Sequence, residues 1–125
     1  MLEFQTPYPR VSREKAERAL IHIARAVGEA NVRVGDDECA AYAGDESEVP
    51  PVLPDGVVLA RSADDVSVCL RVCNEHGVPV TPRAAGTGKT GGAVPVSGGI
   101  VLATGGMNAV KELSAEVEAL KAKGN

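Results

Sequence analysis

A glycine-rich stretch in the middle of the chain is the feature best suited to chemistry. Residues 83–92 read Arg-Ala-Ala-Gly-Thr-Gly-Lys-Thr-Gly-Gly, and they follow a short apolar run. Glycine has no Cβ, so a ligand can approach the main chain closely, and successive N–H groups in a tight bend can converge on an anion. The composition therefore predicts a loop that holds a diphosphate through backbone amides.

Two common phosphate-binding motifs do not account for this stretch. Gly88-Lys89-Thr90 ends like a P-loop, but that motif needs a glycine where Arg83 stands and a helix after Thr90. Residues 86–91 match Gly-x-Gly-x-x-Gly, yet the Rossmann fingerprint needs its third glycine in the first turn of a helix. Pro95 and the further glycines of residues 92–99 predict a loop there instead. A flexible surface loop without a ligand is the alternative interpretation.

Length and composition limit the classes of protein. The 125 residues allow one compact domain, and 44% hydrophobic with 24% charged residues is typical of a globular protein. Aromatic residues make up only 2%, so the core is expected to be aliphatic. A net charge of -4 without a basic stripe argues against nucleic-acid binding. No signal sequence and no transmembrane segment is recognised, so a cytoplasmic location is expected.

The cysteines and histidines are expected to be structural rather than catalytic. Three cysteines, an odd number, fit a reducing compartment better than a set of disulfides. Cys69 and Cys73 would share the buried face of a helix, and no further ligand stands at metal-binding spacing, so no metal site is predicted. His76 would lie at the end of that helix, where the dipole favours a cation, and His22 lies among apolar positions of another helix.

Residues 1–50 are expected to form a helical N-terminal appendage. Ser12 fits the N-cap of a helix whose apolar residues recur at helical spacing as far as Gly28. A shorter helix is predicted over residues 37–42. The prolines of residues 50–54 then keep the chain extended and mark a boundary.

Residues 51–112 are expected to form a small α/β (α+β) unit with a parallel or mixed sheet and flanking helices. A strand over 57–60, a helix that begins with a Ser62–Asp65 capping box and ends at Gly77, and a strand over 78–80 make a βαβ unit. Its strands should be parallel and joined by a right-handed crossover. The glycine-rich loop leaves the carboxyl end of the second strand, where open α/β sheets bind ligands. A third strand is predicted over 100–103.

Several motifs in one order carry a resemblance to a known family. They run from Tyr42-x-x-Asp45-Glu46-Ser47 through residues 73–80 and 82–95 to Met107-Asn108. Over about residues 31–111 the chain resembles the start of the FAD-linked oxidases of the vanillyl-alcohol oxidase and p-cresol methylhydroxylase family. Within that family it is most similar to the glycolate oxidase subunit and D-lactate dehydrogenase group, which oxidises 2-hydroxy acids. The resemblance implies the first subdomain of a PCMH-type FAD-binding domain.

The resemblance also implies a set of cofactor contacts. The loop would wrap the flavin pyrophosphate with its amides, and Pro82 and the segment near Met107 would lie against the cofactor. Thr87 stands where some relatives carry a histidine bonded covalently to the flavin, so the FAD is expected to be noncovalent. Lys89 would either pair with a phosphate or remain solvated. The implied FAD-binding residues are Pro82, Arg83, Ala84, Ala85, Gly86, Thr87, Gly88, Lys89, Thr90, Gly91, Gly92, Met107 and Asn108.

Departures from the family limit the functional expectation. Ala84 and Ala85 replace glycines that relatives usually have, which adds methyl groups near the ligand. Residues 113–125, with Ser114 as N-cap, are expected to form a C-terminal helix where the family continues into a second FAD-binding subdomain and a substrate domain. Because the substrate-binding groups come from that later sequence, no catalytic residue is named. The chain is expected to be the first subdomain, isolated by truncation, gene splitting or design.

Three functions stay open on these grounds. The first is part of an FAD-dependent oxidoreductase that needs a second polypeptide to complete the FAD site. The second is a stand-alone nucleotide-binding module, and the third is a noncatalytic remnant or interaction module that binds no nucleotide. An interrupted fold would leave strand edges unpaired, so a second polypeptide or a homo-oligomer is the expected partner besides the flavin dinucleotide.

Overall fold

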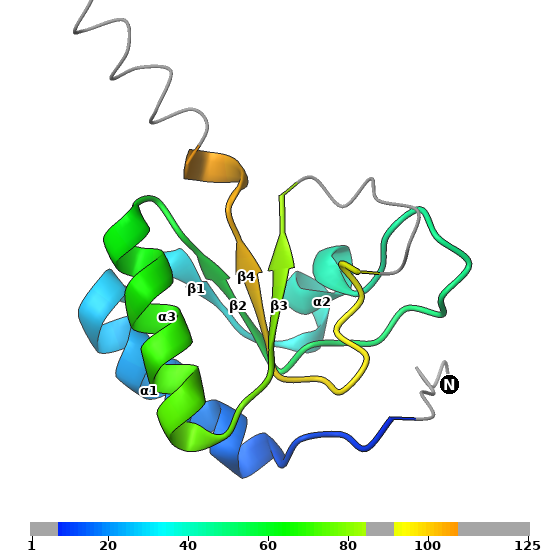
Figure 1. Ribbon diagram of the computed structural model, residues 1–125, viewed down its shortest axis with the longest axis horizontal. Coiled ribbons are helices and arrows are strands. Elements are labelled where there is room, and N and C mark those ends of the chain that lie inside the picture. Colours follow the sequence, from blue (N-terminus) through cyan, green and yellow to red (C-terminus); the bar gives the residue numbers. More distant parts are fainter. Residues whose placement is uncertain (1–7, 85–91, 108–125) are drawn as a thin grey trace, which may run out of the picture.

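The computed structural model describes residues 8–84 and 92–107, which form a mixed sheet between two layers (Figure 1). The strands lie in the order β1 (Val32–Arg33), β2 (Gly56–Leu59), β4 (Ile100–Ala103) and β3 (Val80–Arg83). β1 is antiparallel to β2, whereas β2 and β3 both pair with β4 in parallel. The predicted α/β class with a small mixed sheet is therefore confirmed.

The two long helices begin and end where the sequence predicts. Helix α1 (Arg13–Val27) starts after Ser12, whose side chain accepts a hydrogen bond from the Lys15 N–H, and ends at Gly28. Helix α3 (Ala63–His76) starts after Ser62 and ends at Gly77, which has a left-handed conformation with φ 68°. Such a φ suits glycine because a Cβ would be strained there. Caps thus fix both helices locally, before any packing.

Both faces of the central strands are buried by aliphatic side chains, as the composition predicts. Val58, Ile100 and Leu102 pack toward α1 and α3 on one face. Val57 and Val101 pack on the other face against Cys39 of the short helix α2 (Asp36–Cys39). Parallel strands that are buried on both faces have continuous apolar sequences, because neither face meets water. This explains the sequences of β2 and β4.

Helix α1 belongs to the same core as the sheet. Its residues Ala16, Ala19, Leu20 and Ile23 are buried in one cluster with residues of α3 and β4. Figure 1 shows α1 and α3 lying side by side over one face of the sheet. Helix α1, expected as part of a separate appendage, therefore shares one core with α3 and the central strands.

Three strand and helix predictions need correction. The strand expected over 78–80 begins later and is β3, Val80–Arg83. Val78 is not part of it because its N–H still donates a hydrogen bond to the carbonyl of Cys73 at the end of α3, at 2.8 Å. Strand β1 was not expected. The helix expected over 37–42 is divided into α2 and a 3-10 turn, Ala40–Tyr42. The strand over 100–103 is confirmed.

The strands of the expected βαβ unit are parallel but not neighbours, because β4 lies between them. The register aligns Leu59 of β2 with Ala103 of β4, and Ala103 with Arg83 of β3. Three carboxyl ends therefore reach the same level at one edge of the sheet. Neither residues 85–91 of the glycine-rich stretch nor the helix expected over 113–125 falls within the described residues.

The cysteines lie in the core, and the two histidines contact each other across α1 and α3. Cys39, Cys69 and Cys73 are free thiols and are buried, and Cys69 and Cys73 share the inner face of α3 as predicted. A hydrogen bond with Cys69, together with burial, raises the pKa of Cys73. His22 is exposed on α1, and its ring meets the ring of His76 edge-on with centroids 5.9 Å apart.

Within residues 8–84 and 92–107, no helix has the length and apolar character to cross a membrane.

Candidate functional site

The carboxyl ends of β2, β4 and β3 surround a hollow of about 370 Å³, called here the carboxyl-edge hollow. The three arrows in Figure 1 point toward this edge. Small residues from the strand ends and from the turn after β4 make up much of its lining. The lining residues are Asn31, Tyr42, Leu59, Ala60, Arg61, Ala84, Ala103, Gly105 and Gly106.

Backbone hydrogen bonds continue past the strands and hold the rim of the hollow. The Ala60 N–H donates to the Ala103 carbonyl at 2.9 Å, and the Thr104 N–H donates to the Arg83 carbonyl at 2.8 Å. At Gly105 a Cβ would lie 3.0 Å from the Ala84 carbonyl oxygen, closer than side chains ordinarily pack. Glycine at this position lets the turn after β4 pass over the end of β3 and leaves main chain facing the hollow.

The carboxyl-edge hollow suits an anionic ligand. Among the described residues that line it, Arg61 carries the only charge and none is a carboxylate. Its volume lies at the lower end of the range for small-molecule sites, about 300–1,000 Å³, so it would take part of a dinucleotide rather than all of it. Open α/β sheets bind ligands outside the carboxyl ends of their strands, and this hollow has that position.

Three described FAD-contact candidates in or near β3 line two different hollows. Ala84 lines the carboxyl-edge hollow, whereas Pro82 and Gly92 line a second hollow of about 440 Å³ beside β3. Pro82 is exposed on an edge strand, where its missing N–H costs no ladder hydrogen bond. Their predicted contacts with FAD stay predictions.

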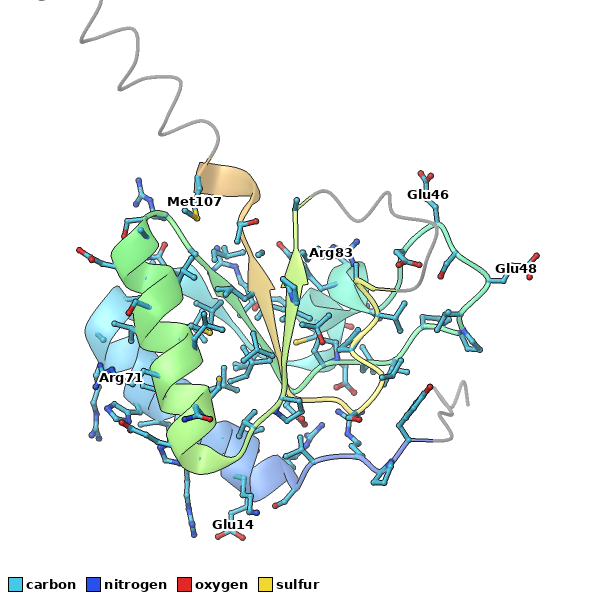
Figure 2. All side chains as sticks on the ribbon, viewed as in Figure 1. Glu14, Glu46, Glu48, Arg71, Arg83 and Met107 are labelled. Atoms are coloured by element: carbon cyan, nitrogen blue, oxygen red, sulfur yellow. The ribbon has the colours of Figure 1, made fainter. Side chains whose placement is uncertain are left out.

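The Arg83 side chain, labelled in Figure 2, is held by residues of the segment between β1 and β2. Its guanidinium carbon lies 5.6 Å from the centroid of the Tyr42 ring, within the range of a cation–π interaction. Its Nη1 also donates a hydrogen bond to the Gly44 carbonyl. A contribution of Arg83 to ligand binding would therefore come through its main chain or through the position it gives to the segment that follows.

Met107 packs against the core on the α1 and α3 side, and its N–H donates to the Thr104 carbonyl at 3.0 Å. Its expected contact with the cofactor is not tested by this position. The other candidates lie outside the described residues: Ala85, Gly86, Thr87, Gly88, Lys89, Thr90, Gly91 and Asn108.

Sequence reasoning missed much of the lining of the hollow. Ala60 ends a predicted strand and Arg61 directly follows it, and Gly105 and Gly106 follow another predicted strand within three residues. The rule that ligands bind at strand carboxyl ends, applied to every strand rather than to one, would have found them. Asn31 and Tyr42 carry no such signal, because only the folded chain brings them to this edge.

Comparisons with known proteins agree with this geometry. The sequence profile of a family described as "FAD binding domain" matches residues 54–124, more than half of the chain. The match continues into the segment 113–125, which was expected to depart from the family. The chain is also 39% identical over 75 residues to the glycolate oxidase subunit GlcD of Bacillus subtilis (strain 168), an alignment that covers 60% of this chain and 16% of that protein.

Two further similarities cover more of the chain. It is 32% identical over 111 residues to the D-lactate dehydrogenase of Anaerostipes hadrus, which covers 88% of this chain and 22% of that protein. Its fold is similar to the crystal structure of p-cresol methylhydroxylase with substrate bound, with a TM-score of 0.66, 25% identity and coverage of 78% of this chain and 20% of that chain. The chain thus spans about a fifth of the length of these proteins.

Proposed function

Because the chain belongs to the FAD binding domain family, we propose that it forms the part of an FAD-linked oxidoreductase that binds the FAD pyrophosphate. The observation that carries this proposal is the carboxyl-edge hollow, which combines small residues, main chain at Gly105 and Gly106, and a lining without a carboxylate among the described residues. In the sequence, the glycine-rich residues 85–91 come just after β3 and Ala84, and the carboxyl end of β3 lies at this edge. Backbone amides of such a segment would hold the charged bridge.

We propose that the FAD is held noncovalently. The support is Thr87, a hydroxyl side chain at the place where the family resemblance puts the flavin-linked histidine of some relatives. Precipitation of the flavin-loaded protein with acid should release all of the flavin into the supernatant. Flavin that stays with the precipitated polypeptide would contradict noncovalent binding.

A 2-hydroxy acid such as glycolate or D-lactate is the proposed substrate class of the complete enzyme. Its support is the similarity to a glycolate oxidase subunit and to a D-lactate dehydrogenase. FAD would supply the chemistry by accepting two electrons from the substrate, while the protein orients the substrate and the FAD relative to each other. In the complete flavoenzyme, glycolate or D-lactate should bleach the flavin absorbance without oxygen, and bleaching by p-cresol alone would assign a different substrate class.

Calorimetric titration of the 125-residue chain with FAD and with ADP tests the site directly. A Gly88→Asp variant adds a carboxylate and a side chain to the glycine-rich segment, and it should weaken FAD binding at least about tenfold. Ser67→Asp adds the same charge at an exposed position of α3 and should leave binding unchanged. Equal affinity for ADP and FAD would favour a stand-alone nucleotide-binding module. A chain that binds neither would contradict FAD binding by this chain alone and would leave the partner-dependent site and the noncatalytic remnant.

A further inference from the structure

Residues 42–47, called here the clasp segment, fasten both ends of the glycine-rich stretch. At its start, Arg83 donates to the Gly44 carbonyl and makes a cation–π contact with the Tyr42 ring. At its end, the Ala93 N–H donates to Oδ2 of Asp45 at 3.3 Å. We propose that Asp45 is a positioning residue: with Arg83 it fixes the two ends of this stretch and so sets FAD affinity without touching FAD. The affinity part of this inference rests on the proposed function.

The two oxygens of the Asp45 carboxylate have separate partners. Oδ1 accepts from the Ser47 N–H at 2.9 Å and from the Ser47 hydroxyl, which closes a local turn of the Asx type. Oδ2 accepts from the N–H of Ala93, which is distant in the sequence. One oxygen therefore shapes the clasp segment, and the other ties it to the far end of the glycine-rich stretch.

The clasp segment is itself anchored to the fold. Ala43 is buried, and its carbonyl accepts from the Val52 N–H at 2.8 Å. Cys39 of α2, four residues earlier, is buried against β2 and β4. Tyr42 lines the carboxyl-edge hollow, so the segment lies next to the proposed site. The ends of the glycine-rich stretch are thus attached to a support that packs on the sheet.

Fixed ends matter because the sequence of residues 83–92 is rich in glycine. Glycine loses more conformational freedom on ordering than any other residue, and that loss opposes ligand binding. A backbone site whose ends are already held has less entropy to lose when the ligand binds. Both tethers join positions far apart in sequence, 39 residues for Arg83 with Gly44 and 48 for Ala93 with Asp45.

The alternative is that Asp45 only shapes its own turn, and Asp45→Asn separates the two roles. Asparagine keeps one carbonyl oxygen, which can still accept from the Ser47 N–H, but its NH₂ group then faces the Ala93 N–H, another donor. The matched control is Glu46→Gln, which removes the same charge from the next residue. Glu46 is exposed, and Figure 2 shows its side chain directed away from the molecule.

Trypsin provides a readout that does not depend on FAD. Cleavage after Lys89 reports opening of the glycine-rich stretch, and cleavage after Arg71, in the middle of α3, reports global unfolding. Without FAD, the ratio of Lys89 to Arg71 cleavage should rise about tenfold in Asp45→Asn, the change expected for one lost hydrogen bond to a charged group. It should stay within about twofold of wild type in Glu46→Gln.

The FAD dissociation constant of the same three proteins completes the test. Asp45→Asn should bind FAD about tenfold more weakly, and Glu46→Gln should bind it as wild type does. An unchanged cleavage ratio in Asp45→Asn, or equal increases at Lys89 and Arg71, would overturn the inference. A raised ratio with unchanged FAD affinity would overturn the positioning role. If the wild type binds no FAD, FAD binding by this chain without a partner fails and the affinity claim with it, while the ratio still decides whether Asp45 holds the stretch.

Discussion

Asp55 and Gly99 exchange two hydrogen bonds at the amino-terminal edge of the sheet. The Asp55 N–H donates to the Gly99 carbonyl at 2.7 Å, and the Gly99 N–H donates to the Asp55 carboxylate at 2.8 Å. Each residue directly precedes a strand, and those strands start in register with Gly56 opposite Ile100. The pair therefore fixes the register of β2 and β4. That register places Leu59 beside Ala103, and both residues line the carboxyl-edge hollow.

Replacing Asp55 with alanine should destabilise the fold strongly. The carboxylate is 1% exposed, and its loss would leave the buried Gly99 N–H without this acceptor and remove the partner of Arg10, 3.2 Å away. We expect the free energy of unfolding to fall by about 3 kcal/mol, measured by urea denaturation. Asp37→Ala, at an exposed position of α2, should change it by less than about 0.5 kcal/mol. Equal effects of the two variants would contradict this role of Asp55.

Gly99→Ala should be more damaging than Gly77→Ala, although both glycines have a left-handed φ. A Cβ on Gly99 would lie 2.4 Å from the Pro79 carbonyl oxygen, whereas a Cβ on Gly77 would meet nothing within 4 Å. Gly77→Ala should cost about 1 kcal/mol through backbone strain alone. Gly99→Ala should cost at least about 2 kcal/mol more, because main chain must move. The urea midpoints of the two variants test this, and similar midpoints would show that the space around Gly99 adapts.

Ala84→Leu should weaken FAD binding without weakening the fold. Ala84 is exposed and lines the carboxyl-edge hollow, so a larger side chain fills space there and not in the core. We expect FAD affinity to fall at least about tenfold, with the free energy of unfolding within about 0.5 kcal/mol of wild type. Ala63→Leu places the same side chain at the exposed start of α3 and is the control. Normal FAD affinity in Ala84→Leu would place the ligand elsewhere.

Stability should fall at alkaline pH in part because of Cys39. Burial raises the pKa of this thiol above its ordinary value of 9.0, and Asp36, Asp55 and Glu38 add to the shift while Arg13 opposes it. As pH rises past 9.0, the unfolded chain loses this proton first, so the stabilisation present below that pH is lost. The stability advantage of wild type over Cys39→Ala should therefore shrink between pH 9 and pH 10, by at most about 1 kcal/mol. Urea denaturation at both pH values measures it; a constant difference would refute the role of Cys39.

Local signals predicted the helices and one central strand. Ser12 and Ser62 cap α1 and α3, and Gly28 and Gly77 end them, because capping involves groups only a few residues apart. The strand over 100–103 is a short apolar run between glycines and a polar residue, a pattern that already indicates burial on both faces. The composition of the glycine-rich stretch likewise predicts a backbone site, and its place in the sequence after a strand predicts that this site lies at the carboxyl edge of the sheet.

The tertiary structure alone decided how these elements meet. No local pattern indicates that β4 inserts between β2 and β3, or that Tyr42 reaches the carboxyl-edge hollow. The contacts of Asp45 with Ala93 and of Asp55 with Gly99 join residues more than 40 positions apart. Such pairings depend on which strand edges and loops approach when the shared aliphatic core is buried. The residue types therefore determined the elements and predicted the kind of site, whereas packing determined the strand order and the side chains that surround the carboxyl-edge hollow.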